Sequence, residues 1–495
     1  MTTSHKSVAH PAIAFAAAAA AVLIAGCAGT GGTRSVAIKL DPSTLASTES
    51  ISAHHHAEAH WPRADWWVDY GDAQLDQLMT AALQGQPSVR VAEARFRLAT
   101  AASKVSRAAM YPEVNAAARG TRQRFSENGV ASPSLAGEVD SINDINVVLS
   151  YDLDLWGRDR AALEASLDRA SAAQVDVQAA RLMLTSAVAR TYFALNLAHT
   201  QLDIAQAALH QRQQLLSLTQ RRVDAHLDSR VALTLAETLI PTTRKEIFAL
   251  TESIIRLENQ LALLAGKGPD AGRGIHRPML GHLPMIGLPS EIPAELIGRR
   301  PDVVAARWRV EAAAADVDVA RTQFYPNISL NAFVGAQSVG LDNLVSIGSR
   351  VLGIGPAITL PIFDGGRLRG VLAANQAAYD VAVEQYNGTL VSALHDVVEQ
   401  LVQLQSLEHQ VREQEDALAL SEQSLRLANA RYGQGLESFL HVLKAEGDVL
   451  AQRRLSAALH SRQAECRMNL DRALGGGALP THGPSNAAVS DVAGP

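Results

Sequence analysis

The sequence predicts an α+β membrane protein built from two repeats of one domain, and three observations lead to this prediction. Residues 87–112 align without a gap on residues 301–326, and 10 of the 26 aligned pairs are identical. Each repeat continues with two segments of alternating polar and apolar residues, which predict strands. Each then runs on as a long proline-free stretch of helical pattern. A period of about 210 residues indicates a duplicated domain, because solenoid units are far shorter.

The composition fits long, closely packed helices and argues against nucleic-acid binding. Of the 495 residues 47% are apolar but only 4% are aromatic, and alanine makes up much of the difference. The net charge is −6, and it becomes −7 (43 basic against 50 acidic residues) once a signal segment containing Lys6 is removed. Neither value offers the basic surface that a nucleic acid requires.

The N-terminus predicts a secretory signal. Lys6 precedes an apolar run, residues 11–24, that is too short to cross a bilayer as a permanent helix. Small residues then lead to Cys27, the arrangement of a bacterial lipobox, in which the thiol is acylated and becomes the first residue. We therefore expect residues 1–26 to be a lipoprotein signal peptide and Cys27 to be lipidated. An ordinary signal that leaves a cysteine first is the alternative. Ala28 resembles the second residue of lipoproteins sent to the outer membrane.

Residues 27–60 are small and polar and predict a flexible, lipidated segment. Its histidine run, His54 to His56, could bind metal, but without other ligands such a run is more often a solvated tether. The only other cysteine, Cys466, lies in a helical pattern, and we expect it to pack there as a small apolar side chain. If Cys27 carries lipid, no disulfide can form within the chain.

Each repeat carries two predicted strands of roughly ten residues, the length that crosses a bilayer when tilted. In the first repeat a weak pattern follows Pro112 and a clear one begins at Asp144; in the second, alternating segments begin at Asn327 and Leu352. The polar positions of the clearest strand are expected to line a lumen, although the last two could equally belong to the junction with the helix: Asp144, Asn146, Asp152 and Asp154.

A long helix follows each pair of strands. Apolar residues recur at every seventh position from Val188 to Val223, and the positions 209 residues later repeat this seam from Val397 to Tyr432. Two seams in register predict packed coiled-coil helices. The first helix runs from Gly157 to about Asp224, or ~100 Å at ~1.5 Å per residue.

The helices are expected to reverse at matching turns. In the second repeat Gly433 and Gly435 allow a tight turn and Ser438 caps the next helix. The matching turn, residues 224–229, keeps the leucine and the serine but has neither glycine. The expected organisation is a first repeat at 61–265, a Gly/Pro-rich linker at 266–295, a second repeat at 296–475 and a disordered tail at 476–495.

Four strands cannot close a barrel, and an open sheet edge cannot lie in lipid because its backbone groups would lack hydrogen-bond partners. The chain must therefore pool its strands with other copies, which gives eight strands in a dimer or twelve in a trimer. An eight-stranded barrel is filled by its own side chains, whereas a larger barrel leaves a lumen. Passage of a solute therefore favours the trimer, whose helices continue the tube beyond the membrane.

Several motifs occur in the order that one known family shares: Trp66-Trp67-Val68-Asp69-Tyr70-Gly71-Asp72, Arg299-Arg300-Pro301-Asp302-Val303, Phe324-Tyr325-Pro326-Asn327-Ile328-Ser329-Leu330 and Pro361-Ile362-Phe363-Asp364-Gly365-Gly366-Arg367. With them, residues 60–475 resemble the TolC-type outer-membrane factors, and the lipobox resembles their NodT-like lipoprotein branch. The resemblance implies a homotrimer with a shared 12-stranded outer-membrane barrel and a long periplasmic helical tunnel, lipid-anchored in a Gram-negative bacterium. It also implies two partners, a periplasmic membrane-fusion adaptor and an inner-membrane pump, most often of the resistance-nodulation-division class.

The resemblance places the helical turns at the periplasmic entrance, where they constrict the pore and dock the adaptor. The matching residues are Arg431, Tyr432, Gly435, Leu436 and Ser438 in the second repeat and Arg222, Leu227 and Ser229 in the first. Ordinary packing and capping of a coiled-coil turn is the alternative role for these residues.

The chain departs from the family at one place. The family often has acidic residues shortly after these turns, which form rings that select cations. Here the matching positions hold His441, Lys444 and Ala232, so an acidic ring is not expected. Three His441 side chains meeting on the axis would bring like charges together on protonation and make the entrance sensitive to pH.

We therefore expect the exit duct of a tripartite efflux pump, which passively conducts drugs or other small toxic solutes. No catalytic, cofactor-binding or metal-binding motif occurs in the sequence, and its 16 histidines have no ligand spacing. A duct for type I secretion or metal-ion efflux is one alternative. A structural coiled-coil lipoprotein is another, but such a rod needs no strands of membrane length.

Overall fold

A computed structural model describes residues 35–45, 61–129, 132–281 and 298–477 of the chain. The chain divides into two compact units, and each unit draws on both repeats. The first unit holds residues up to Lys39, Arg97–Ala172 and Arg307–Gln385; the second holds Leu40–Phe96, Ala173–Ala306 and residues from Tyr386 onward.

Several predicted features lie wholly or partly outside the described residues: the signal segment 1–26, Cys27 and most of the flexible segment that ends at residue 60, the histidine run from His54 to His56, residues 282–295 of the linker, and the tail beyond Gly477. They remain predictions from the sequence.

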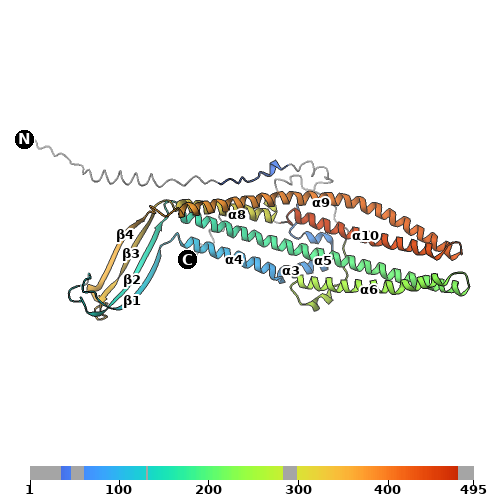
Figure 1. The fold of residues 1–495 in the computed structure, drawn as a ribbon, viewed down its shortest axis with the longest axis horizontal. Coiled ribbons are helices and arrows are strands. Elements are labelled where there is room, and N and C mark those ends of the chain that lie inside the picture. Colours follow the sequence, from blue (N-terminus) through green and yellow to red (C-terminus); the bar gives the residue numbers. More distant parts are fainter. Residues whose placement is uncertain (1–34, 46–60, 130–131, 282–297, 478–495) are drawn as a thin grey trace, which may run out of the picture. The chain divides into compact units, whose positions relative to one another are not determined.

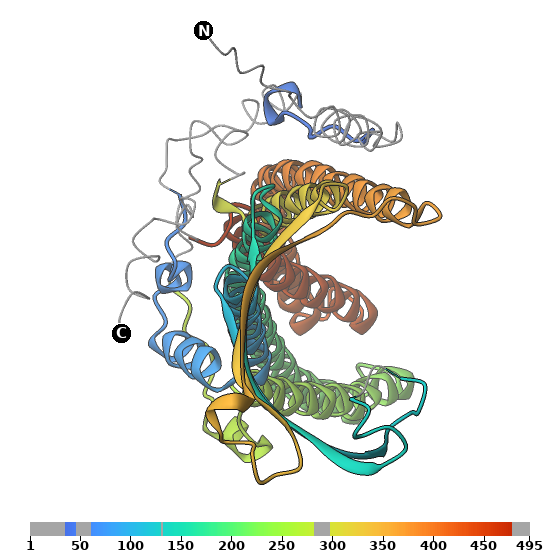
Figure 2. The same cartoon turned by 90° about the vertical axis from the view of Figure 1, so that its left-hand side faces the viewer.

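The first unit contains a four-stranded antiparallel sheet of order β1-β2-β3-β4, which Figure 2 shows as a curved surface. Its strands are β1 (Glu113–Arg124), β2 (Val139–Leu153), β3 (Asn327–Val339) and β4 (Arg350–Thr359). Each repeat supplies one hairpin, as predicted, and the pairing of β2 with β3 joins the two repeats. Within the described residues, the outer edges of β1 and β4 have no partner strand, so the sheet is open on both sides.

One face of this sheet is apolar and open. Ile145 on β2, Val334 on β3 and Leu352 and Ile354 on β4 are between 50% and 78% exposed. Val334 pairs directly with Leu352, so these side chains form a continuous band on one face. A chain surrounded by water rarely exposes an apolar band of this kind.

Two pairs of long helices follow the strands (Figure 1). The helices α5 (Arg158–Asp224) and α9 (Arg367–Gly433) have 67 residues each, and α6 (Arg230–Leu264) and α10 (Phe439–Ala473) have 35 each. The predicted heptad seams are buried at some positions and half-buried at others. Val188 and Leu195 and their matches Val397 and Leu404 are at most 2% exposed, whereas Leu202, Leu209 and Leu216 are half-buried. No described helix has an apolar stretch long enough to cross a bilayer.

Proline begins the helix that precedes each hairpin. The helices α4 (Pro87–Ala108) and α8 (Pro301–Thr322) both have 22 residues. Proline suits this first position because its missing N–H would have no partner there. The shorter elements are η1 (Pro42–Thr44), η2 (Trp66–Tyr70), α3 (Ala73–Gly85), η3 (Pro269–Gly274) and η4 (Ile347–Ser349).

The largest core cluster of the second unit forms around η2 and α3. Trp66, Tyr70 and Leu75 are at most 2% exposed and pack against α5, where Tyr192 is fully buried. Asp72 caps α3 by accepting a hydrogen bond from Gln74 N at 2.9 Å, and its other carboxylate oxygen accepts one from the Tyr192 hydroxyl at 2.7 Å. The tryptophan-rich motif therefore forms the core of this unit.

Candidate functional site

The two helical turns predicted as functional have the same backbone geometry, and both belong to the second unit. In the first turn Leu227 N donates to Arg222 O at 2.7 Å, and in the second Leu436 N donates to Arg431 O at 2.9 Å. Each turn needs one residue with positive φ, which Gly435 supplies at 76° and His226 at 56°. This accounts for the glycine missing from the first turn, since histidine is one of the residues that enter this region at modest cost.

Each turn also carries an arginine and an acid at matching positions. Arg222 Nε lies 3.5 Å from Asp228 Oδ2, and Arg431 Nε lies 3.4 Å from Glu437 Oε2. The first pair is largely buried, with side-chain exposures of 15% and 16%, whereas the Arg431 side chain is 61% exposed. The buried pair will be less screened by solvent than the exposed one.

Tyr432 joins the second turn to the first. Its hydroxyl donates to Asp228 Oδ2 at 2.7 Å, and its backbone carbonyl accepts a hydrogen bond from Arg222 Nη1 at 3.1 Å. The Arg222 guanidinium carbon also lies 4.5 Å from the centre of the tyrosine ring, within the range of a cation–π contact. We call Arg222, Asp228 and Tyr432 the turn latch.

An apolar cluster supports the turn latch. Tyr432 is 1% exposed and meets Phe439 at a ring-centre distance of 6.1 Å, with Leu215 and Ala232 in the same cluster. Burial raises the pKa of Tyr432, and the nearby Asp228 carboxylate adds to this effect. The hydroxyl therefore keeps its proton and remains a donor to Asp228.

The two serines that follow the turns differ in their contacts. Ser229 caps α6, because its Oγ accepts a hydrogen bond from Ala232 N at 3.2 Å. Ser438 occupies the N-cap position of α10 but makes no side-chain cap hydrogen bond. The predicted capping role of Ser438 is therefore wrong. Its Oγ lies 3.2 Å from His441 Nδ1, and this contact replaces the cap.

His441 has an acidic neighbour that the sequence reading overlooked. Its Nδ1 lies 2.6 Å from Glu437 Oε1, one helical turn earlier in the sequence. A protonated His441 would therefore pair with a carboxylate of its own chain rather than stand as an isolated charge. The pH-sensitive ring of three histidines stays a prediction. Contact with Glu437 would reduce the repulsion between charged His441 side chains on which this prediction depends.

The tips of both turns expose apolar side chains at matching positions. Leu227 and Leu436 are 66% and 65% exposed, and four residues later Val231 and Leu440 are 69% and 64% exposed. The two turns therefore present two similar apolar surfaces.

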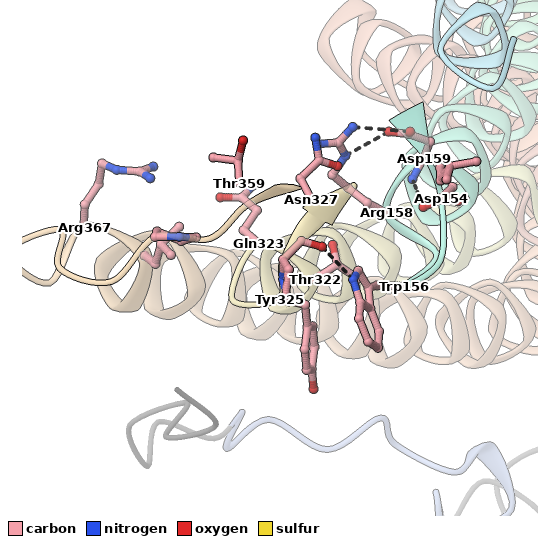
Figure 3. A pocket seen from close by; sticks show the side chains of 14 residues that line it. Asp154, Trp156, Arg158, Asp159, Thr322, Gln323, Tyr325, Asn327, Thr359 and Arg367 are labelled. Atoms are coloured by element: carbon pink, nitrogen blue, oxygen red, sulfur yellow. Dashed lines mark hydrogen bonds and ion pairs between the residues drawn. The ribbon is translucent and has the colours of Figure 1, made fainter. Parts of the chain in front are cut away.

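A second candidate region lies in the first unit, where the strands meet the helices (Figure 3). A cavity of about 300 Å³ opens there between the ends of β2 and β4 and the starts of α5 and α9. The rings of Trp156 and Tyr325 stack at 4.9 Å beside it, and Trp156 Nε1 donates to Pro326 O at 2.8 Å. These contacts fix the chain reversal at the strand ends.

The acidic residues at this junction are used by the chain itself. Asp154 accepts hydrogen bonds from the backbone N–H groups of Asp159 and Arg160 at the start of α5. Burial opposes its ionisation, but these bonds prevail and hold the pKa of Asp154 below its usual range. Asp152 pairs with Arg158 at 3.1 Å. Of the two roles left open by the sequence, both aspartates take the junction role.

Sequence reasoning missed a buried ion pair above the turns. Arg212 Nε on α5 lies 2.7 Å from Glu446 Oε1 on α10, and Arg212 Nη1 donates to Thr243 Oγ1 on α6 at 2.6 Å. Glu446 is 1% exposed. The heptad pattern could have indicated this pair, because a glutamate next to a buried apolar seam is stable as a carboxylate only when a positively charged side chain lies beside it.

In the described part of the chain, no three His, Cys, Asp or Glu side chains come close enough to hold a metal ion. Cys466 is buried, and burial raises the pKa of its thiol to about 11. It is therefore a poor nucleophile and packs as the predicted small apolar side chain.

The sequence matches a known family along most of its length. A family model described as "outer membrane efflux protein" matches residues 78–267 and 292–476. The fusaric acid resistance protein FusA of Burkholderia cepacia is 39% identical over 368 residues, which are 74% of this chain and 69% of that protein. The multidrug resistance outer membrane protein MdtP of Escherichia coli (strain K12) is 32% identical over 465 residues, 92% of this chain and 94% of that protein.

Solved structures agree with these matches. The outer membrane protein VceC of Vibrio cholerae has a TM-score of 0.80 at 37% sequence identity and covers 84% of this chain and 100% of its own. The outer-membrane channel OprN has a TM-score of 0.80 at 26% identity and covers 90% of this chain and 98% of its own. The predicted TolC-like fold, with four strands per chain and paired long helices, is confirmed, and the chain belongs to the outer membrane efflux protein family.

Proposed function

We propose that this protein is the outer-membrane exit duct of a tripartite efflux pump and passively conducts drugs or other small toxic solutes out of the periplasm. The open four-stranded sheet with its exposed apolar face is the observation that supports this most strongly. Such a sheet is satisfied only when its edges pair with strands of other copies and its apolar face meets lipid.

The assembly that fits is a homotrimer. Three chains of four strands give a shared barrel of 3 × 4 = 12 strands, in which the β4 edge of one copy pairs with the β1 edge of the next. Twelve strands leave a lumen, and Asp144 and Asn146 lie on the strand face opposite to Ile145 and Val147. Asp144 and Asn146 therefore face the lumen.

Lipidation of Cys27 attaches the chain to the outer membrane. The proposal rests on the lipobox in the sequence and on the outer-membrane names of the relatives. Metabolic labelling with palmitate tests it directly, because Cys27→Ser abolishes incorporation if the thiol is the acylated group.

The helical turns form the periplasmic entrance and receive the adaptor. The turn latch holds the two turns of one chain together, which suits a gate that opens when the contact is broken. The exposed leucines Leu227 and Leu436 suit an apolar partner surface. Arg431, Gly435, Ser229, Ser438 and His441 shape the same two turns.

Planar-bilayer conductance of the purified protein, with its mass measured by light scattering in detergent, tests the duct. A trimer that forms discrete ion-conducting pores is the expected result. A monomer without conductance would overturn the duct and favour a structural coiled-coil lipoprotein. Efflux of drugs against metal ions, measured with each candidate pump and adaptor, separates the drug duct from the metal-ion and type I secretion alternatives.

A further inference from the structure

The described residues 35–40 are extended and are held by side chains of two distant helices. Asp380 Oδ1 on α9 accepts hydrogen bonds from Ser35 Oγ and from the backbone N–H groups of Val36 and Ala37, the latter two at 3.2 and 3.1 Å. Lys39 Nζ lies 2.7 Å from Glu311 Oε1 on α8. In the second unit, Leu40 N donates to Asn387 Oδ1 at 2.9 Å.

Apolar burial does not hold this segment in place. Val36 and Ile38, its large apolar residues in the first unit, are 84% and 80% exposed. The ion pair of Lys39 with Glu311 is also exposed, and such pairs contribute about 0–1 kcal/mol. Asp380 makes the strongest of the contacts described above, because one carboxylate oxygen accepts from three successive residues and hydrogen bonds to an ionised acceptor are the stronger kind.

We propose that Asp380 is the clamp of an N-terminal strap, residues 35–40, and that the clamp fixes how far the lipidated end of the chain can lie from the helices. The clamp itself rests on the contacts described above. Its role as a spacer rests on the proposed lipidation of Cys27, and the two can fail separately.

The lengths support a spacer. Cys27 precedes Ser35 by eight residues (35 − 27), which span at most about 27 Å when fully extended. Asp380 follows Arg367, the first residue of α9, by 13 residues (380 − 367), or about 20 Å of helix. An acylated Cys27 can therefore reach the level at which the strands end and α9 begins, but little beyond it. The clamp thus sets the depth of the lipid anchor against the strand–helix junction.

The clamp persists over the whole physiological pH range. The hydrogen bond from Ser35 Oγ and those from the strap backbone lower the pKa of Asp380 below the usual 3.8. A lowered carboxyl pKa means that the contact is present above the usual value and is lost as pH falls through the lowered one. The strap is therefore a permanent connection rather than a pH-dependent one.

Hydrogen exchange measured by mass spectrometry tests the clamp in the full-length protein. We expect Asp380→Ala to increase exchange in the peptide covering residues 35–40 by at least about tenfold, because local opening no longer has to break the carboxylate contacts. Asp380→Asn keeps an acceptor without the charge and should give an intermediate rate. Asp318→Ala is the matched control, since Asp318 is an exposed helical aspartate that pairs with Arg321 in its own helix.

Two results would overturn the clamp: free-chain exchange of residues 35–40 in the wild type, or equal exchange in the Asp380→Ala and Asp318→Ala proteins. Unchanged thermal unfolding of Asp380→Ala confirms that the fold is intact, as expected for a half-buried residue whose described contacts are with the strap.

A deletion of residues 29–32 tests the spacer. It places the anchor four residues before Ser35 (8 − 4), a span of about 14 Å at most, which is shorter than the roughly 20 Å of helix to be spanned. We expect the strap to lose protection in the lipidated protein and to keep it in a Cys27→Ser protein with the same deletion. Equal protection in both, with palmitate incorporation shown for the first, would overturn the spacer and leave the clamp standing. Absence of palmitate would instead refute the proposed lipidation.

Discussion

The first turn (Asp224–Ser229) and the second turn (Gly433–Ser438) close with the same hydrogen bonds, yet their side chains are buried to different degrees. The first turn buries its arginine–acid pair beneath Tyr432, which comes from the second. The second leaves Arg431 exposed and uses Glu437 to meet His441. The two turns of the duplicated domain thus share a backbone conformation and differ in single side chains. Tyr432 of the second turn packs onto Arg222 and Asp228 of the first, and the first turn has no matching side chain.

The same contrast continues along the helices. Glu446 on α10 is buried against Arg212, whereas the matching Glu237 on α6 is exposed. Asp471 on α10 is buried, and the matching residue on α6 is the buried Ala262. Glu237 therefore provides an internal control for Glu446, because the same substitution can be made at both positions of one molecule.

The largest difference is expected at the buried glutamate. Glu446→Gln removes the negative partner of Arg212 and leaves a nearly buried guanidinium uncompensated, which costs about 3–5 kcal/mol. Glu237→Gln at the exposed match should change stability by less than about 0.5 kcal/mol. Denaturant unfolding followed by circular dichroism measures both. Equal losses would mean that the buried pair contributes nothing beyond its surface counterpart.

The second difference concerns pH. Burial raises the pKa of Asp471 to about 7, against the opposing effect of Arg467 and with a further contribution from Asp69. The folded carboxyl therefore holds its proton where the unfolded one, at 3.8, has lost it. Stability should fall as pH rises from about 4 to 7, by at most about 1.4 kcal/mol per pH unit. Unfolding of Asp471→Asn across this range should show a flatter dependence; parallel curves would contradict the assignment.

The third prediction separates the two turns by conductance. Tyr432→Phe removes the hydroxyl that donates to Asp228 and weakens the turn latch by about 1 kcal/mol, or about fivefold in the open population. Single-channel recordings should show more frequent opening. Glu437→Gln, which alters the contacts of Glu437 with Arg431 and His441 and leaves the turn latch unchanged, is the control. If Glu437→Gln increased opening more than Tyr432→Phe did, the contacts of the second turn, and not the turn latch, would control opening.

A smaller effect is expected from exchanging the residues of positive φ. His226→Gly relieves a left-handed backbone and should stabilise the chain by about 0.5–1 kcal/mol. Gly435→Ala should destabilise it by about 1 kcal/mol through the backbone alone, because no atom lies within 4 Å of the added Cβ. Melting temperatures of the two variants should shift in opposite directions. Shifts of the same sign would show that the turns are not equivalent.

The smallest difference lies in the caps. Ser229→Ala loses the hydrogen bond to Ala232 N and should cost about 1 kcal/mol, whereas Ser438→Ala has no cap to lose. Thermal unfolding of the two variants compares them directly. A larger cost at Ser438 would show that its contact with His441 stabilises α10 more than a cap would.

The sequence predicted the repeated architecture well because periodicity is a local property. The heptad seam and the flanking residues gave α5 its bounds to within a residue, and the alternating segments located the strands. Glu237 and Glu446 show where this reasoning ends. The two glutamates occupy the same position of the repeat, and only Arg212, 234 residues away from Glu446, decides which is buried.

The roles of individual site residues could not be predicted for the same reason: each depends on which nearby group the side chain contacts in the folded chain. The alternation of β2 continues beyond its last residue, Leu153, so the pattern could not separate a lumen-facing Asp152 from a junction one. Ser438 has the right residue type for a cap, but His441 one turn later offers a competing contact. Nothing near Ser35 in the sequence indicates that its partner is Asp380.

The equal lengths of the matched helices, 67 and 67 residues and then 35 and 35, restrict how this chain can change. Each turn lies at the end of a helix of 67 residues, and the equal lengths of these two helices bring Tyr432 to the level of Asp228. An insertion of one heptad in α5 alone would displace that turn by about 10 Å and separate the phenol from its carboxylate. A longer or shorter tube therefore requires concerted edits in all four helices, made in whole heptads.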